Sequence, residues 1–443
     1  MPVSVFDTLL SLGFSDDDAR SRAALIERAA TGLAHETGQP AEWRWFVPGR
    51  IEIFGKHTDY AGGRSLVAAV PRGFAVAAAP RADGLVRVVD ARYGSEATID
   101  PADRDRVLSG WANYVTVVAR RLAQNFPGAD LGIDIAIASD LPRAAGVSSS
   151  SALVVGIATA LIERGALDAR ADWLDAIRTP VDLAGYFGAL ENGLAFGRLA
   201  GGAGAGIHGG SEDQTAILLS RPGRVSAYSY VPVVHRGDEL MPGGWRFVVA
   251  SSGIEADKAG SARDRYNRAS LSSRAILELW NAHSGRPRDT LAAALESGPD
   301  ARVELRQIVA ERPHRGFGAD ELTRRLAHFV AEDERVPLAA LAFRRSDAAG
   351  LGELSAASQS EADRWLGNQI PETRDLARLA RECGAFAASS FGAGFGGSVW
   401  ALVDAPGADA FQAGWREAYQ ARYPRTGLVE SFVAVPGPGL VKL

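Results

Sequence analysis

The sequence predicts an α+β protein built from two domains, because of its length and the way helical and strand-forming segments are mixed. At 443 residues the chain is long for one hydrophobic core, so two domains of roughly 200 residues each are expected. Segments rich in β-branched residues and amphipathic helical segments occur in both halves. We therefore predict domains over residues 1–236 and 237–443, with a helical leader over residues 1–44 at the start of the first.

The elements of the first half follow from local composition. Residues 1–40 are expected to form helices, with Ser15 capping one of them just before three aspartates. Partial alternation and β-branched content predict strands over 74–80, 85–91 and 132–140, and residues 113–126 have the pattern of an amphipathic helix.

After Gly146 a cluster of serines opens a long apolar helix that is expected to stop near Gly165. A glycine-rich loop over residues 201–210 then leads to a short apolar segment and a strand-like one. From residue 245 a second unit begins, which is mostly helical until a glycine loop and strand over 391–403. Both halves therefore mix helices and strands, as the α+β prediction requires.

Composition and charge exclude several classes of protein. Apolar residues make up 47% of the chain and charged residues 23%, which is ordinary for a globular protein. The net charge of −5 gives no reason to expect nucleic acid or an anionic membrane as a partner. The single cysteine, Cys383, suits a reducing compartment, and neither a signal peptide nor a membrane-spanning run is recognisable. We expect a cytoplasmic protein, and its oligomeric state is not predicted.

The segment "LPRAAGVSSSSAL" (141–153) has the composition of a phosphate-binding loop. Small residues let the backbone approach a ligand, and the N–H groups at a helix start attract an anion. One serine is enough to cap a helix, so four in a row exceed what capping needs. We therefore predict a phosphate site at this helix N-terminus.

Other known phosphate and metal motifs are absent. "GAGFGG" (392–397) has dinucleotide-site spacing, but a strand-like segment follows it where that site requires a helix. Such a loop could still approach another ligand or the neighbouring domain. Gly49 and Gly55 are spaced wrongly for a P-loop, and "HETGQ" at residue 35 lacks the second histidine of a metalloprotease.

A polar segment between a strand and a glycine turn is the most unusual stretch of the chain. In "RIEIFGKHTDYAGG" (50–63) the strand-like run breaks at Gly55 into Lys56, His57, Thr58, Asp59 and Tyr60. Only three lysines occur in the chain, and the remaining 45 of its 48 basic residues are arginine. A lysine inside this segment is therefore expected to have a specific role.

Motifs in a fixed order resemble the GHMP kinases and, within them, the galactokinase branch. They are "PGRIEIFGKHTDYAGG" (48–63), "LPRAAGVSSSSAL" and "FGAGFGG" (391–397), supported by "GGSEDQTAI" (209–217) and "ASSGIEADKAGSARDRYNR" (250–268). The resemblance implies a two-domain GHMP kinase fold, with a ribosomal-S5-like N-terminal domain and a ferredoxin-like C-terminal domain. It also implies that ATP and a sugar bind between the domains and that the sugar's anomeric hydroxyl is phosphorylated.

The resemblance also assigns roles to individual residues around the sugar. Asp213 would accept the proton of the sugar hydroxyl, and Arg50 would keep that aspartate ionised. A second group would hold the sugar itself, namely His57, Asp59, Tyr266 and Gly210. The alternatives are a helix cap for Asp213, a surface side chain for Arg50 and a turn residue for Asp59.

On the nucleotide side, the resemblance implies ATP and Mg²⁺ as cofactors. The ATP phosphates would lie on the serine loop, that is on Gly146, Val147, Ser148, Ser149, Ser150 and Ser151. Ser150 and Glu191 would be the Mg²⁺ ligands, although Glu191 could instead be a solvated helix glutamate.

Lys56 departs from the family pattern, in which a glutamate at this position takes the hydroxyl at the far end of the sugar. A group that only accepts hydrogen bonds has become one that only donates them. One hypothesis is that Lys56 binds a substrate with an altered C6, such as a uronic acid. The other is that it turns outward or pairs with a nearby acid such as Glu52 or Glu212, and the sugar is neutral.

A second class of protein shares these motifs: galactokinase-like proteins that bind ATP and sugar but act as regulators. Loss of the catalytic residues would favour that class. Arg50, Asp213 and the serine loop are all present, so the sequence favours an enzyme. Amino sugars and cyclitols remain possible substrates.

Overall fold

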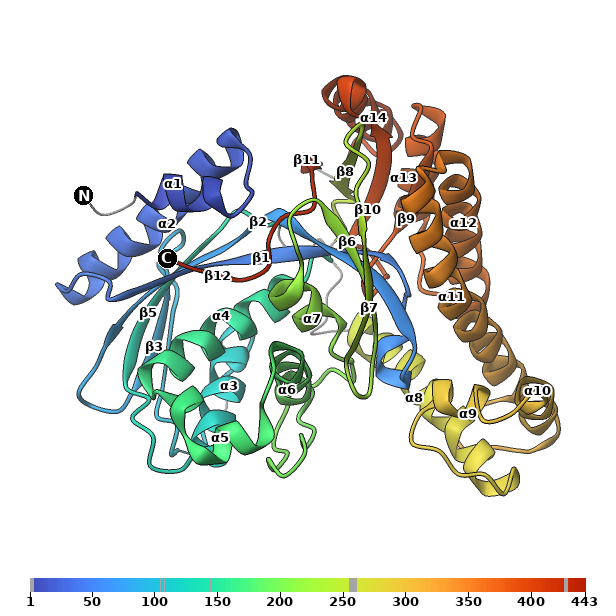
Figure 1. Ribbon diagram of the computed structural model, residues 1–443, viewed down its shortest axis with the longest axis horizontal. Helices are drawn as coiled ribbons and strands as arrows, with labels where there is room; N and C mark the ends of the chain where they lie inside the picture. Colours follow the sequence, from blue (N-terminus) through green and yellow to red (C-terminus); the bar gives the residue numbers. More distant parts are fainter. Residues whose placement is uncertain (1–3, 104, 107, 143–145, 255–260, 426–428) are drawn as a thin grey trace.

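The computed structural model describes residues 4–103, 105–106, 108–142, 146–254, 261–425 and 429–443. Parts of two motifs, residues 143–145 and 255–260, therefore lie outside the described residues. The described chain forms two β-sheets with helices packed on both faces of each (Figure 1). The described chain is therefore of the α+β class, as expected from the sequence.

The larger sheet has eight strands within the described residues, in the order β12-β1-β2-β5-β3-β4, with β6 joined to β2 and β7 to β6. Its strands are β1 (Trp43–Phe54), β2 (Arg64–Pro80), β3 (Val86–Asp90), β4 (Glu96–Ile99), β5 (Ile133–Ser139), β6 (Arg224–Ser229), β7 (Val234–Leu240) and β12 (Val441–Lys442). The chain's last strand, β12, returns to pair with β1 (Figure 1).

Helices cover the two faces of this sheet. One face carries α1 (Val5–Ser11) and α2 (Asp16–Thr37), and the other carries α3 (Ala112–Asn125), α4 (Ser149–Arg164), α5 (Ala171–Ala176), α6 (Pro180–Asn192) and α7 (Glu212–Leu219). As predicted, Ser15 caps α2, because its side chain accepts a hydrogen bond from the Asp18 N–H.

The smaller sheet has the strand order β11-β8-β10-β9. Its strands are β8 (Trp245–Ser251), β9 (Ala387–Ser390), β10 (Ser398–Asp404) and β11 (Ser431–Ala434). One face packs on α13 (Pro371–Glu382) and α14 (Ala408–Arg422), and the other on α11 (Ala319–Arg345) and α12 (Ala348–Glu361). Near the first half of α11 lie α8 (Ser261–His283), α9 (Leu291–Leu295) and α10 (Ala301–Glu311). Single-turn helices elsewhere in the described chain occupy Asp59–Ala61, Leu167–Ala169, Ala362–Leu366 and Ala405–Gly407.

Most elements expected from the sequence are confirmed. The strands predicted over 74–80, 85–91 and 132–140 lie in β2, β3 and β5, and the predicted helices over 113–126 and after Gly146 are α3 and α4. Residues 391–397 join the antiparallel strands β9 and β10, so this glycine loop does not have the strand–helix context of a dinucleotide site. The boundary predicted at residue 236 falls within β7, and the division at that residue stays a prediction.

No helix in the described part of the chain combines the length and the apolar character needed to cross a membrane.

The polar segment after β1 is held in place by α11 of the C-terminal half. Glu332 Oε1 on α11 accepts hydrogen bonds from the backbone N–H groups of Gly55 at 3.1 Å and Lys56 at 3.3 Å. Further along the segment, the side chain of Arg325 donates to the His57 carbonyl, and Asp333 binds both the backbone N–H and the side chain of Arg64. A turn that lines the N-terminal half thus takes its position from a helix more than 260 residues later.

Lys56 is part of this clamp and is fully buried. Its Nζ donates to Ser358 Oγ at 2.5 Å and to Ser389 Oγ at 2.8 Å, and Ser358 in turn donates to Glu332 Oε1 at 2.9 Å. Burial lowers the pKa of Lys56. Burial alone would raise the pKa of Glu332, but Lys56 and its other basic neighbours hold it at about 2. The lysine and the glutamate therefore stabilise each other inside the core.

Replacing Lys56 with methionine should destabilise the fold, because it removes one of the basic groups around the buried Glu332 charge and leaves Arg335, 2.8 Å away, as its direct partner. We expect the K56M variant to lose about 3 kcal/mol of unfolding free energy, measured by urea denaturation. The double variant K56M/E332Q should recover part of that loss.

The matched control is Lys442→Met, because Lys442 forms an exposed ion pair with Glu163 at 2.7 Å. A surface pair contributes less than about 1 kcal/mol, so K442M should unfold nearly as the wild type does. Equal stability of K56M and wild type would contradict the proposed clamp.

Candidate active site

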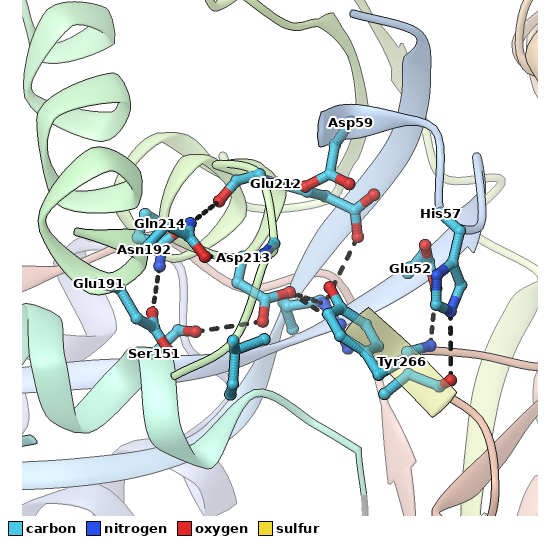
Figure 2. Close-up of a pocket in the computed structure, with 16 residues that line it drawn as sticks. Glu52, His57, Asp59, Ser151, Glu191, Asn192, Glu212, Asp213, Gln214 and Tyr266 are labelled. Carbon is cyan, nitrogen blue, oxygen red and sulfur yellow. Dashed lines mark hydrogen bonds and ion pairs between the residues drawn. The ribbon is translucent and has the colours of Figure 1, made fainter. Parts of the chain in front are cut away.

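A polar pocket lies where β1, α7, the start of α8 and the β9–β10 loop meet (Figure 2). It brings together residues that are up to 343 positions apart, from Arg50 to Ala393. Eight of the predicted site residues line it, namely Arg50, His57, Asp59, Ser151, Glu191, Gly210, Asp213 and Tyr266.

Arg50 is the central cation of the pocket. Its Nε and Nη2 atoms each lie 2.8 Å from Asp213 Oδ1, and its Nη1 donates to the Gly146 carbonyl at 2.6 Å. Burial alone would lower the pKa of Arg50, but Asp213 and two glutamates nearby raise it above its usual range. Arg50 is therefore buried and charged, and the surface alternative is wrong.

Asp213 is held from two sides. Arg50 binds its Oδ1, and Ser151 Oγ donates to its Oδ2 at 3.1 Å. The aspartate is the second residue of α7, but it points into the pocket beside Ser151 (Figure 2). A carboxylate fixed in this way keeps its position and its charge, which a general base needs.

The start of α4 has the features of a phosphate site. The backbone of Ser148 lies in the left-handed region, with φ of 62°, and Gly146 just before it has φ of 72°. Ser148 is buried, and its Oγ has no hydrogen-bond partner in the described part of the chain. The N–H groups in the first turn of a helix also lack partners within that helix. These donors fit the oxygen atoms of a nucleotide phosphate.

The side chains next to the start of α4 are of the types that bind Mg²⁺ in nucleotide enzymes. Glu191 is buried and accepts a hydrogen bond from Gln214, so it is not a solvated helix residue. Ser150, the other predicted ligand, is at the start of α4. The described residues hold no cluster of three or more acidic, histidine or cysteine side chains suited to a metal. Mg²⁺ typically uses only one or two carboxylates together with substrate phosphates, so this donor set suits it.

On the other side of the pocket, Asp59 and Gly210 are packed together. A Cβ atom on Gly210 would lie 2.3 Å from Asp59 Oδ2, so only glycine allows this approach. Asp59 Oδ2 also accepts a hydrogen bond from the Glu212 backbone N–H at 3.3 Å. Burial raises the pKa of Asp59 to about 6, with Asp213 adding to the effect. Asp59 is therefore a buried acceptor in the pocket and not merely a turn residue.

His57 lies between an aromatic wall and the β9–β10 loop. Its ring centroid is 5.0 Å from that of Tyr266. Its Nδ1 lies 3.0 Å from the Tyr60 hydroxyl, and its Nε2 lies 3.1 Å from the Ala393 carbonyl. Because a carbonyl only accepts, Nε2 carries the proton that binds Ala393, and Nδ1 of this tautomer accepts from the Tyr60 hydroxyl.

Lys56 does not line this pocket, and its ammonium lies in the core cluster with Ser358 and Ser389. Neither arrangement considered from the sequence is found. The lysine is not turned outward, and the acid to which it is linked through Ser358 is Glu332, not Glu52 or Glu212. Local sequence could not reveal this, because the partners come from α11, α12 and β9.

Two buried glutamates of the pocket, Glu52 and Glu212, were considered from the sequence only as partners for Lys56 and not as site residues. Glu52 stands two residues after Arg50 on β1, and residues two apart on a strand face the same side. That alternation was a usable signal, since Ile51 and Ile53 pack into the core on the opposite side.

The glycine-rich loop 201–210 is tied down on two sides. The Ala205 N–H donates to the Glu191 carbonyl at 2.8 Å, and the His208 N–H donates to Asn267 Oδ1 on α8 at 2.9 Å. Asn192 binds the loop's end through Gly209 and Gly210. The loop therefore joins α6 of the N-terminal half to α8 of the C-terminal half beside the pocket.

Family models match three regions of the chain. They are the galactokinase galactose-binding signature over residues 34–80, the GHMP kinases N terminal domain over 113–179 and the GHMP kinases C terminal region over 339–421. A galactokinase from Chloroflexus aggregans is 31% identical over 407 residues, which cover 89% of this chain and 92% of that protein. The chain belongs to the galactokinase family.

Other comparisons agree with this family. A galactokinase from Roseiflexus is 28% identical over 397 residues, covering 89% of this chain and 92% of that protein. The solved structure of Lactococcus lactis galactokinase complexed with galactose superposes with a TM-score of 0.76 at 24% identity, covering 96% of this chain and all of that one. As a galactokinase-family member, the chain is a sugar 1-kinase.

Gly210→Ala should weaken sugar binding, because the added methyl group displaces Asp59. We expect KM for the sugar to rise at least about 10-fold, the loss of roughly one charged hydrogen bond, while KM for ATP changes little. Steady-state kinetics with each substrate varied in turn would measure both values.

Gly243→Ala is the control, because a Cβ atom at Gly243 meets no other atom within 4 Å. It should leave both KM values unchanged. An unchanged sugar KM in G210A would show that the packing of Gly210 on Asp59 does not matter for the sugar.

Proposed function

We propose that this protein transfers the γ-phosphoryl group of ATP to the anomeric hydroxyl of galactose or a closely related sugar. The observation that carries the proposal is the arrangement of Asp213, held by Arg50 and Ser151 next to the N-terminus of α4. Phosphoryl transfer requires an in-line nucleophile, a base to position it and donors for the charge of the transferred group. The family signature over residues 34–80 supports a galactose-like sugar.

In this proposal each residue has a distinct task. Asp213 accepts the proton of the anomeric O–H while that oxygen attacks the γ-phosphorus, and the bond to the ADP oxygen breaks. Arg50 keeps Asp213 ionised and offsets negative charge. Asp59 accepts hydrogen bonds from sugar hydroxyls, and His57 and Tyr266 form the wall behind them.

The nucleotide would lie at the start of α4, with its phosphates on residues 146–151. Ser150 and Glu191 would hold Mg²⁺, which would supply positive charge to offset that of the ATP phosphates. The use of ATP and the single cysteine favour the cytoplasm as the site of action.

The proposal favours a neutral sugar over a uronic acid. Among the described residues that line the pocket, Arg50 is the one lysine or arginine, and Asp213 already occupies it. Lys56, which one of the two hypotheses places on a substrate carboxylate, points into the core. The regulator alternative is not favoured either, since Arg50, Asp213 and Ser151 are joined by hydrogen bonds in the pocket.

ADP release with Mg·ATP and a panel of sugars tests the proposal. The panel comprises galactose, glucose, N-acetylgalactosamine, galacturonate and glucuronate. Turnover with galactose above the other sugars is the expected result. Binding of both ATP and sugar without turnover of any sugar would favour the regulator instead.

Asp213→Asn should abolish most of the activity while preserving binding. The amide cannot take up a proton, so kcat should fall by about 10²- to 10⁴-fold. Calorimetric titration should show sugar affinity within a few-fold of wild type. Asp172→Asn is the control, since Asp172 pairs with Arg170 on the surface and does not line the pocket. Full activity of D213N would remove Asp213 from the mechanism.

A further inference from the structure

Two buried carboxylates of the pocket have no task in the mechanism above. Glu52 comes from β1 and Glu212 is the first residue of α7, and their exposed fractions are 3% and 4%. Figure 2 shows Glu52 beside His57 and Glu212 beside Asp59, on the side of the pocket away from Ser151 and Glu191. They therefore face the space that the sugar, not the phosphates, would occupy.

The oxygen atoms of these glutamates are short of hydrogen-bond donors. Glu52 Oε2 accepts from the Gly392 N–H at 2.6 Å, but Oε1 has no hydrogen-bond partner in the described part of the chain. The Glu212 carboxylate has only an ion-pair contact among these residues, with its Oε1 3.7 Å from Arg50 Nε. No oxygen of either glutamate is among the fully buried atoms of the described chain that lack a partner, so these acceptors open onto the pocket, where a ligand that brings donors can bind them.

Neighbouring side chains of the pocket do not supply hydrogen bonds to these oxygen atoms. Both ring nitrogens of His57 are already engaged, by the Tyr60 hydroxyl and the Ala393 carbonyl. Arg50 gives its shortest contacts to Asp213 and Gly146. Burial raises the pKa of Glu52 to about 7 and the pKa of Glu212 well above its usual value, as expected for carboxyl groups without sufficient donors. Donors brought by a bound sugar would favour the ionised forms, and an ionised carboxylate only accepts hydrogen bonds.

The charge of the pocket also limits what can bind. Five carboxyl groups line it, those of Glu52, Asp59, Glu191, Glu212 and Asp213, around the single guanidinium of Arg50. A substrate carboxylate placed here would add like charge in a buried site, which is strongly unfavourable. A hydroxyl or an ammonium group would instead give the open oxygens their missing donors.

We propose that Glu52 and Glu212 form an acceptor-only end of the sugar pocket, which selects a sugar presenting hydroxyl or ammonium donors there and rejects one presenting a carboxylate. This inference rests on the proposed sugar-kinase function and adds its specificity-determining residues. Glu52 supplies the acceptor that position 56 does not, since Lys56 is in the core. Selection of this kind uses both attraction to donors and repulsion of anions.

The first test compares three sugars that differ only at C6, namely galactose, 6-amino-6-deoxygalactose and galacturonate, with galactosamine added to place an amine at C2. For the wild type we expect kcat/KM for galacturonate to be at least about 100-fold below that for galactose, because like charges in an interface are strongly disfavoured. The ratio of kcat/KM for galactose to kcat/KM for 6-amino-6-deoxygalactose shows whether a hydroxyl or an ammonium group is the preferred donor. A wild type that prefers galacturonate overturns the proposal.

The second test uses Glu52→Gln and Glu212→Gln, which keep size but replace one acceptor oxygen with a donor. Each should raise KM for galactose by about 10- to 100-fold, the loss of one hydrogen bond to a charged group, with kcat within a few-fold of wild type. Each should also reduce the ratio of kcat/KM for galactose to kcat/KM for galacturonate. Unchanged KM and unchanged selectivity in both variants overturn the proposal.

Glu239→Gln is the matched control. Glu239 is also buried, pairs with Arg344 and does not line the pocket, so E239Q should keep wild-type KM values. If E52Q fails to fold, the wild-type sugar comparison and E212Q still decide the question.

Failure of this inference and failure of the proposed function give different results. Phosphorylation of galactose together with indifference to E52Q and E212Q leaves the kinase proposal standing and removes the acceptor end. If no sugar is phosphorylated, calorimetric titration with the same sugars decides. Binding of galactose but not galacturonate then supports the acceptor end, and the reverse preference or the binding of neither overturns it.

Discussion

The pocket depends on one buried guanidinium, that of Arg50. It binds the Asp213 carboxylate, the Gly146 carbonyl of the phosphate loop and, more loosely, Glu212. These groups come from two separate parts of the chain, and without a cation between them their negative charges and dipoles would repel one another. Arginine suits this position because its guanidinium holds five N–H donors in a fixed planar fork, whereas a lysine ammonium has three. The same residue therefore orients the base, fixes the loop and permits an unusually acidic pocket.

A second constraint is that the sugar side of the pocket is assembled by both halves of the protein. The segment after β1 supplies His57 and Asp59, but its backbone is held by Arg325 and Glu332 of α11. The buried Lys56–Ser358–Glu332 network connects that segment to α12 as well. Because a buried charge is costly without its partner, this network specifies one position of the turn relative to the C-terminal half. A site that distinguishes sugars by the positions of their hydroxyl groups requires rigid support of this kind.

Much of the fold and part of the site could be predicted from sequence, and the differences have physical causes. Local signals were sufficient for the capped helix after Ser15, the strands β2, β3 and β5, and the apolar helix α4. Motif order located Arg50 and Asp213, which the structure brings within 2.8 Å of each other although they are 163 residues apart.

Lys56 was misplaced because its surroundings are set by tertiary contacts. The scarcity of lysine in the chain correctly indicated a specific role for Lys56. Its partners Ser358, Ser389 and Glu332, however, lie about 300 residues away in the sequence. Glu52 was overlooked as a site residue for the opposite reason. It was considered only as a partner for Lys56, and its place in the pocket follows from the two-residue alternation with Arg50 along the strand.

The central claim is that the phosphoryl group is transferred to the anomeric oxygen of the sugar, and the identity of the product tests it most directly. Phosphorus-31 NMR of a reaction with Mg·ATP and galactose would identify the esterified oxygen through the protons to which the new phosphate couples. The account predicts a single sugar phosphate whose phosphorus couples to the anomeric proton, with ADP formed in equal amount. A phosphate coupled to the two C6 protons, or ADP formed without any sugar phosphate, would contradict it.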